Sequence, residues 1–207
     1  MNEYHKIQTV FKRDGKRLID GQWTLPEFEY LAGNQWTYTE KVDGTNIRII
    51  LRDGAVTFGG RTDAAQIPAT LVARLNEKFL PLAETMKAMF PGDACLYGEG
   101  YGPKIQKVGG NYRDNQDFVM FDIRVGDFWL RREDVESVAL WLGIDVVPVI
   151  GEGTLHNAIS WARDGIKSTW GDFQAEGIVA RPKTELRMRN GDRVITKIKC
   201  CDFGVDK

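Results

Sequence analysis

The sequence predicts an α+β fold built mainly from antiparallel sheets, with helices that flank them. Two observations lead to this expectation. Short segments that alternate apolar and polar residues, separated by turn dipeptides, recur along most of the chain. Segments with helical spacing are fewer, and they do not alternate with strands as regularly as a doubly wound parallel sheet requires.

The predicted strands are rich in β-branched and aromatic residues and end at turn signals. They span residues 36–40, 47–51, 55–58, 96–98, 118–124, 128–130, 146–150, 178–180 and 194–198. Asp53-Gly54, Gly126-Asp127 and Asn190-Gly191 are dipeptides typical of tight turns between paired strands. Short turns of this kind favour antiparallel pairing over parallel pairing.

Three stretches are predicted to be helical. Residues 69–89 carry apolar side chains at helical spacing, and Pro81 is expected to divide them into two helices because proline lacks a backbone N–H. Residues 132–142 form a second prediction, with Gly143 at the helix end. Thr154 is expected to cap a third helix that runs to Ala162.

Composition limits the classes of protein that fit. The chain has 207 residues, with 28 Lys and Arg against 29 Asp and Glu, so its formal net charge is −1. This excludes a protein that coats nucleic acid through overall positive charge, although residues 181–199 form a local basic segment. No apolar stretch suits a membrane span or a signal peptide, and three cysteines do not form a disulfide framework. We therefore expect a single cytoplasmic domain over residues 1–207, without a membrane partner.

Six short motifs place chemically active side chains beside the predicted strands. They are Lys41-Val42-Asp43-Gly44, Gly60-Arg61-Thr62, Tyr97-Gly98-Glu99, Phe121-Asp122, Glu176-Gly177-Ile178-Val179 and Lys197-Ile198-Lys199. A lysine such as Lys41 becomes a nucleophile only when it loses its proton, which desolvation or nearby cations favour. Alternation along the last motif places Lys197 and Lys199 on one face of a strand.

The remaining motifs offer groups that bind a nucleotide or a metal. Gly60 lets a ligand approach the backbone, and Arg61 can bind a phosphate through two hydrogen bonds. Glu99 is expected at a strand end between flexible glycines, where a carboxylate suits a ribose or metal contact. Taken singly, each motif also fits a structural role, such as a surface turn at Asp43 or core packing at Phe121.

In their order and spacing, the six motifs resemble motifs I, Ia, III, IIIa, IV and V of the covalent nucleotidyltransferase superfamily. That group comprises ATP-dependent DNA ligases, RNA ligases and GTP-dependent mRNA capping enzymes. Glu40 before the lysine, Thr45-Asn46 after the glycine and residues 102–107 are similar to the RNA ligase 2 family, which seals nicked RNA. The resemblance implies an α+β nucleotidyltransferase domain, the ligase adenylylation domain.

The resemblance also implies roles. The motif I lysine of this family attacks the α-phosphate of ATP, which gives lysyl-AMP and pyrophosphate, and Lys41 occupies that position. Lys197 and Lys199 would stabilise the phosphates. The nucleotide-binding residues implied in this way are Glu40 near the adenine edge, Asp43, Gly44, Arg61 on phosphate or sugar, Glu99 on the ribose, Phe121 stacked on adenine, Glu176, Lys197 and Lys199. Mg²⁺, or Mn²⁺ in its place, would neutralise triphosphate charge, with Glu176 as the stronger candidate ligand and Asp43 as the weaker one.

The reaction implied is the joining of a 3′-hydroxyl to a 5′-phosphate through an adenylylated 5′ end, in nicked RNA duplexes or RNA-containing hybrids. Lys104 and Lys107 are candidates for contact with the RNA backbone. Eight residues follow Lys199, so we expect neither a C-terminal OB-fold nor a helical domain, and a partner subunit could replace it. Three alternatives stay open: a minimal ATP-dependent DNA ligase, a GTP-dependent guanylyltransferase, and a nucleotide- or RNA-binding module without turnover.

Overall fold

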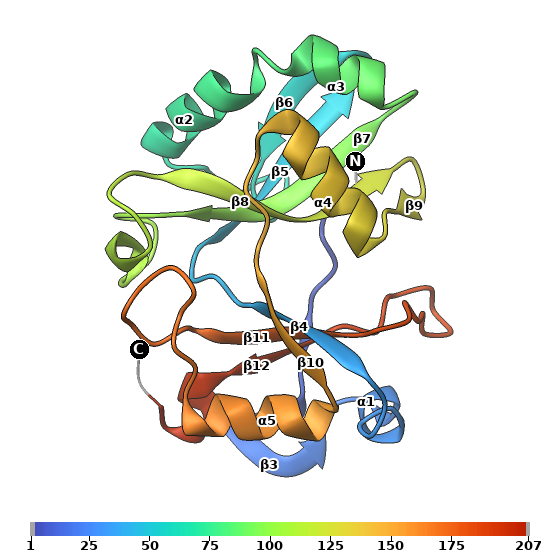
Figure 1. Cartoon of the computed structure of the whole chain (residues 1–207), viewed down its shortest axis with the longest axis vertical. Helices are drawn as coiled ribbons and strands as arrows, with labels where there is room; N and C mark the ends of the chain where they lie inside the picture. The colour runs from blue at the N-terminus through green and yellow to red at the C-terminus, as the bar shows by residue number, and fades with distance from the viewer. Residues whose placement is uncertain (1–2, 206–207) are drawn as a thin grey trace. The chain divides into compact units, whose positions relative to one another are not determined.

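The computed structural model describes residues 3–205, which form two compact units (Figure 1). Unit 1 contains the N-terminal residues up to Tyr4 and the segment Asp43–Val147. Unit 2 contains His5–Val42 and Pro148–Lys207. Each unit has its own sheet and its own apolar core.

Unit 1 is built on a five-stranded antiparallel sheet in the order β6-β5-β7-β8-β9. Its strands are β5 (Thr45–Arg52), β6 (Ala55–Gly59), β7 (Ala94–Tyr101), β8 (Asp117–Val125) and β9 (Phe128–Trp129). Its helices are α2 (Ala69–Phe79), α3 (Ala83–Met89), α4 (Arg132–Leu142) and the 3₁₀ turn η1 (Gly109–Asn111).

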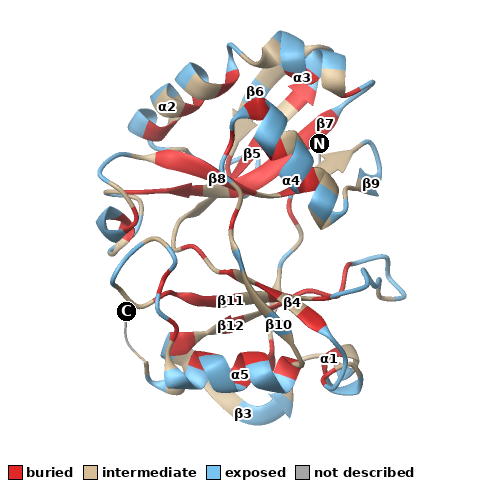
Figure 2. Ribbon diagram, in the orientation of Figure 1, coloured by how far each residue is buried: buried red, intermediate tan, exposed pale blue. Residues whose placement is uncertain are grey.

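The core of unit 1 lies between the sheet and helices α2, α3 and α4. Ile47 and Ile49 of β5 pack with Leu71 and Leu75 of α2 in one buried cluster, which α3 and α4 complete (Figure 2). Since successive side chains of a strand point to opposite faces, Asn46 and the other intervening residues of β5 lie on the face away from this cluster. The same alternation along β7 sets Glu99 on that second face.

Unit 2 has a five-stranded sheet in the order β1-β12-β11-β4-β10, in which only the β1–β12 pair is parallel among the described strands. The strands are β1 (Gln8–Thr9), β4 (Trp36–Glu40), β10 (Val149–Gly153), β11 (Gly177–Pro182) and β12 (Thr196–Lys199), and a hairpin of β2 (Phe11–Asp14) and β3 (Arg17–Trp23) is separate. The helices are α1 (Pro26–Tyr30), α5 (Leu155–Asp164) and the 3₁₀ turn η2 (Cys200–Phe203).

Helix α5 covers one face of this sheet, and its buried side faces β11 and β12 (Figures 1 and 2). Ile198 of β12 is buried in the cluster beneath α5. Lys197 and Lys199 flank it and are only partly buried. The predicted two-lysine face opposite a core face is therefore confirmed.

Most predicted elements are present. Strand β4 and helix α4 have the predicted bounds, and Gly143 ends α4 in the left-handed conformation with φ 63°. The break between α2 and α3 falls around Pro81, as expected. Thr154 caps α5 by accepting a hydrogen bond from the backbone N–H of Asn157.

The predicted strand over residues 146–150 needs correction. Strand β10 starts at Val149 rather than Val146 and continues to Gly153, because these residues complete the pairing along β4. Val146 instead forms an isolated bridge with Met120 of unit 1. Strands β1, β2 and β3 and helix α1 were not predicted from the sequence. No helix within residues 3–205 combines the length and apolar content needed to cross a membrane.

Candidate active site

Lys41 lies directly after β4, where the ladder with β11 fixes its backbone. Its N–H donates a hydrogen bond of 2.9 Å to the carbonyl of Gly177. Its Nζ lies 2.7 Å from Oε2 of Glu176, and the side chain is 21% exposed. The candidate nucleophile is thus held at both its backbone and its amine, yet it remains accessible to solvent.

Glu176 bridges two lysines. Its Oε1 lies 2.7 Å from Nζ of Lys199, while its Oε2 binds Lys41, and only 3% of its side chain is exposed. Burial alone would raise the pKa of Glu176, but the charge of Lys41 and hydrogen bonds from both lysines outweigh it and hold that pKa below its usual value. The carboxylate is therefore ionised, and it holds the two amines on opposite sides of itself.

The same face of β12 carries a third cation. Lys197 lies two residues before Lys199, at the position paired with Val179 of β11. Lys41, Lys197 and Lys199 therefore bring three cations to the surroundings of one carboxylate. Such a surface fits a polyphosphate, because positive groups fixed in advance stabilise phosphate charge without reorganisation.

Gly177 sets the spacing of this cluster. Its φ is +152°, and a Cβ there would overlap the carbonyl oxygen of Ile198 on the neighbouring strand. We expect Gly177→Ala to lower the free energy of unfolding by about 2–4 kcal/mol, since both backbone strain and a backbone clash are introduced. Urea unfolding of wild type and Gly177→Ala would measure this change in unfolding free energy. The matched control is Gly191→Ala, where φ is also positive but nothing lies within 4 Å of the added Cβ; a loss no greater than the control's would contradict the clash.

The lowered pKa of Glu176 predicts a pH dependence of stability. Its ionised form is favoured in the folded state, so it stabilises the fold above the usual pKa of 4.5 and loses that contribution as the pH falls through the lower folded value. We expect unfolding free energy to decline more steeply with falling pH in wild type than in Glu176→Gln. Parallel pH profiles for the two proteins would contradict the assignment.

Glu40 is buried, with 1% of its surface exposed, and its carboxylate is held by a turn that the sequence did not single out. Oε1 accepts a hydrogen bond of 2.6 Å from Ser168 Oγ. Oε2 accepts bonds of 2.8 Å from the backbone N–H and from the hydroxyl of Thr169. No motif marks Ser168 and Thr169 as partners of a glutamate 128 residues away, so only the fold brings them together. The role of Glu40 at the adenine edge remains a prediction.

We expect Glu40→Ala to destabilise the chain by about 1–3 kcal/mol, because three donors would lose their acceptor in a buried site. Glu40→Gln keeps one acceptor oxygen and should lose less. Thermal unfolding of both variants, compared with wild type, checks this order. Equal losses would show that the hydrogen bonds to Ser168 and Thr169 contribute little.

In unit 1, the turn after Lys41 packs directly on β7. A Cβ on Gly44 would lie 2.6 Å from Cγ of Glu99 and would overlap the carbonyl of Gly100. Asp43 donates its backbone N–H to the Tyr112 hydroxyl at 3.1 Å. The structure therefore brings Gly44 and Glu99 together, as two of the predicted motifs require.

Glu99 lies inside β7 and not at a strand end, so that expectation was wrong. It pairs with Asn46 of β5 and Val119 of β8. The neighbouring glycines also serve packing and not flexibility, since a Cβ on Gly100 would lie 2.5 Å from Leu71 and 2.9 Å from Ile47. A Cβ on Gly98 would overlap the ring of Phe118.

Phe121 owes its place to a β-bulge. Tyr97 of β7 pairs with Asp122, whereas the next residue, Gly98, pairs with Met120, so Phe121 is the extra residue. A bulge redirects its side chain relative to a regular strand. The ring is partly buried and contacts Tyr4 edge to face, with centroids 5.0 Å apart.

Arg61 lies in an exposed loop after β6, and a buried arginine holds that loop. Arg48, 1% exposed, donates from Nε to the carbonyl of Gly60 at 2.8 Å and from Nη2 to Asp63 at 2.7 Å. These bonds fix the backbone on both sides of Arg61. The buried position of Arg48 was not predicted, because an arginine in a strand is usually exposed at the surface.

The carboxylate of this cluster fits a divalent metal only in part. Glu176 provides the hard oxygen atoms that Mg²⁺ prefers, but both oxygens accept from ammonium groups. Two adjacent cations would repel a metal that arrived alone. The residues fit a metal that arrives with the phosphates of a nucleotide, since those phosphates supply further oxygen ligands and negative charge.

The fold matches known ligase structures. A variant of the Naegleria gruberi RNA ligase with ATP and Mn superposes with a TM-score of 0.71 and 17% identity, over 96% of this chain and 56% of that one. Another variant without ligand gives 0.68 and 18%, over 98% of this chain and 60% of that one. The complex of that ligase with PPi gives 0.66 and 20%, over 84% and 52%. The chain therefore spans little more than half the length of these proteins, and at this identity the likeness establishes the fold.

The family itself is shown by a sequence match that contains every one of the six motifs. A family model described as RNA ligase matches residues 34–199, most of the chain. The motifs, the two-unit fold and the lysine–glutamate cluster all lie within this match or agree with it. The chain belongs to the RNA ligase family.

Proposed function

We propose that this protein is an ATP-dependent RNA ligase in which Lys41 is the nucleophile. The observation that carries the proposal is the cluster of Lys41, Glu176 and Lys199, with both amines 2.7 Å from one buried carboxylate. A binding module has no need of a partly exposed amine held in this way. Units 1 and 2 would act as one nucleotidyltransferase domain.

In the first step, Nζ of Lys41 forms a bond to the α-phosphorus of ATP, the bond between that phosphorus and the bridging oxygen breaks, and pyrophosphate leaves. The amine must first lose a proton to the surrounding water, which its 21% exposed side chain reaches, because an ammonium group has no lone pair. Lys197 and Lys199 would bind the phosphates of ATP.

The remaining groups would hold the nucleotide. Phe121 would stack on adenine, Glu99 would bind the ribose hydroxyls and Arg61 would contact phosphate or sugar. Glu40 would act near the adenine edge and also fix the Ser168–Thr169 turn. The compact turn at Asp43 and Gly44 would let the backbone approach the nucleotide.

Mg²⁺ or Mn²⁺ would be held by Glu176 together with the nucleotide, with Asp43 as a second candidate ligand. The ion would neutralise charge on the triphosphate. The Naegleria gruberi ligase structures with ATP and Mn support this choice of nucleotide and metal.

In the later steps, an oxygen of an RNA 5′-phosphate would take the AMP from Lys41. A 3′-hydroxyl would then attack that 5′-phosphate, form the phosphodiester bond and release AMP. Sealing assays on matched nicked duplexes of RNA, RNA–DNA hybrid and DNA test the proposal. We expect ATP-dependent sealing of the RNA-containing nicks.

The same assay separates the alternatives. Preferential sealing of the DNA nick would favour a minimal DNA ligase, and use of GTP would favour a guanylyltransferase. Binding of nucleotide without AMP transfer would favour a binding module. A requirement for added protein would point to a partner subunit.

A further inference from the structure

Unit 1 contains a groove that none of the proposed catalytic residues lines. Its volume is about 620 Å³, and it is open to solvent. One wall is the first half of α2, including Thr70 and Arg74, and the other walls are formed by Lys104 and Asn115 in the loops on either side of η1. Gln116 joins these walls, since it accepts a hydrogen bond of 2.6 Å from Thr70 and donates one of 2.8 Å to Pro103.

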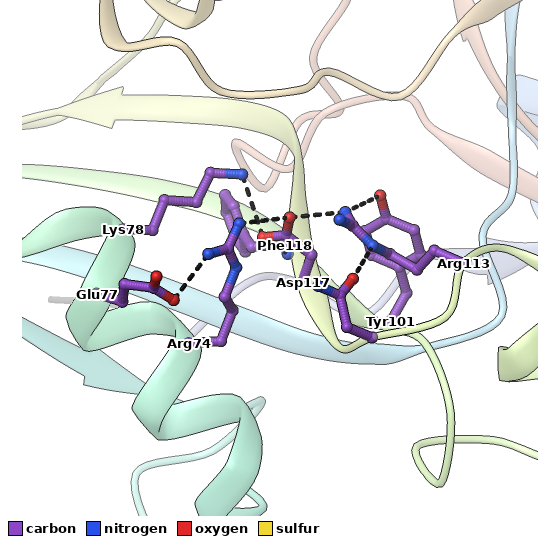
Figure 3. Close-up of polar contacts among 8 residues, drawn as sticks. Arg74, Glu77, Lys78, Tyr101, Arg113, Asp117 and Phe118 are labelled. Atoms are coloured by element: carbon purple, nitrogen blue, oxygen red, sulfur yellow. Dashed lines mark hydrogen bonds and ion pairs between the residues drawn. The ribbon is translucent and has the colours of Figure 1, made fainter.

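Beside the groove, three cations surround one buried carboxylate (Figure 3). Asp117, whose side chain is 3% exposed, accepts from Lys78 at 3.1 Å, from Arg113 at 2.6 Å and from Arg74 at 3.3 Å. Figure 3 shows Arg74 and Lys78 reaching from α2 and Arg113 reaching from the opposite side. One carboxylate can neutralise only one of the three.

The position of these cations is fixed in advance. Burial would raise the pKa of Asp117, but the backbone N–H of Phe118 and the charge of Lys78 outweigh it and keep that pKa below its usual value. Arg113 is held further by Asn115 at 2.7 Å and by the Tyr101 hydroxyl at 3.2 Å. Little side-chain entropy would therefore be lost when an anion binds.

The charge balance favours an anion. The lining itself is neutral, with Arg74 and Lys104 against Glu77 and Asp114. The adjoining cluster adds Lys78 and Arg113 against Asp117, so the groove and the cluster together carry one net positive charge. Arg74 donates one N–H to Glu77 at 2.8 Å and one to Asp117, so its guanidinium retains further N–H donors for an anion. Thr70 and Asn115 add neutral polar groups at the rim.

The shape favours an extended anion over a small one. The groove is open to solvent, and none of the described residues that line it is aromatic and able to stack on a base. Arginine and lysine side chains that contact phosphates position a nucleic acid without reading its sequence. We propose that this groove binds the phosphate backbone of the polynucleotide substrate through Arg74 and Lys104; this inference rests on the proposed ligase function.

The test is the affinity of the full chain for a fluorescently labelled nicked RNA duplex, measured by anisotropy over a series of KCl concentrations. Lys104→Gln is the principal variant, because Lys104 is exposed and makes no hydrogen bond or ion pair recorded within residues 3–205. Arg74→Gln is the second. Lys87→Gln, which removes the same charge from an exposed site on α3, is the matched control.

We expect Lys104→Gln to weaken binding by up to about fivefold, as the loss of one solvent-exposed ion pair does. The slope of log affinity against log salt should fall by about 0.7–0.9. Arg74→Gln should act in the same direction, while Lys87→Gln should change neither quantity. Thermal unfolding of Arg74→Gln shows whether that variant loses RNA affinity because it unfolds or because it lacks the contact with RNA. If Arg74→Gln does unfold, Lys104→Gln alone tests the proposal.

Wild-type affinity and salt slope in Lys104→Gln would overturn the groove assignment, as would an absence of RNA binding by the wild type. AMP transfer to Lys41 in the absence of RNA distinguishes this failure from that of the proposed function, because the groove variants should retain it. If wild type forms no AMP adduct while the groove variants still lose RNA affinity, the ligase proposal fails and the groove stands.

Discussion

Lys41→Ala is expected to abolish sealing of a nicked RNA with a 5′-phosphate, because no other group would carry the AMP. The same variant should still seal a nick whose 5′ end has been adenylylated beforehand. In that substrate the AMP is already on the phosphate, so only attack by the 3′-hydroxyl remains. The measurement is the rate of sealing on both substrates, for wild type and for the variant.

Lys87→Ala provides the control for this pair of assays. Lys87 is a 59% exposed lysine of α3 that lies outside both the Lys41–Glu176–Lys199 cluster and the basic segment 181–199. The control variant should seal both substrates at the wild-type rate. Sealing of the ordinary substrate by Lys41→Ala would contradict the role of Lys41. Loss of both activities, in a variant that remains folded, would show that Lys41 also acts after AMP transfer.

Glu176→Gln is expected to slow formation of the AMP adduct by about 100-fold, the scale seen when a group that orients or ligates at a metal site is lost. The Lys41 amine would lose the carboxylate that holds it at 2.7 Å, and the nucleotide-bound metal would lose its main protein ligand. Lys199 would also lose its partner at 2.7 Å, although its charge remains to bind phosphate. The fall in kcat should therefore exceed any rise in the KM for ATP.

The Glu176 experiment is decided by whether the substitution changes kcat or the KM for ATP. A raised KM with unchanged kcat would place Glu176 in ground-state binding only. An adduct rate within a few-fold of wild type would show that the carboxylate neither orients Lys41 nor holds the metal. Mass spectrometry at increasing ATP concentration measures both constants without RNA.

The sequence predicted those parts of the site that short-range rules govern. Alternation along residues 195–199 correctly predicted that Lys197 and Lys199 lie opposite the core-facing Ile198, and the Asp53-Gly54 turn and Pro81 correctly bounded their elements. These features depend on neighbouring residues alone. Lys41 and Glu176 are 135 residues apart, and their ion pair could not be predicted from neighbouring residues. It forms because the antiparallel pairing of β4 with β11 brings the end of β4 beside the start of β11.

Other parts of the structure had local signals too weak for a prediction. The hairpin of β2 and β3 turns at Gly15-Lys16, and Gly15 has φ +55°, but its charged strands lack clear alternation. The bulge at Phe121 has no signature in the sequence, since it arises from the register between β7 and β8. Gly98 was interpreted as a source of flexibility, whereas the tight contact with Phe118 that requires it is visible only after folding.

The most direct test of the central claim is the intact mass of the full chain after incubation with ATP and Mg²⁺. The protein should first be treated with pyrophosphate to remove any AMP it already carries. We predict a gain of one AMP in wild type, no gain with GTP, and no gain in Lys41→Ala. An adduct of equal yield in Lys41→Ala, or none in wild type with either nucleotide, would contradict the assignment of Lys41 as the nucleophile.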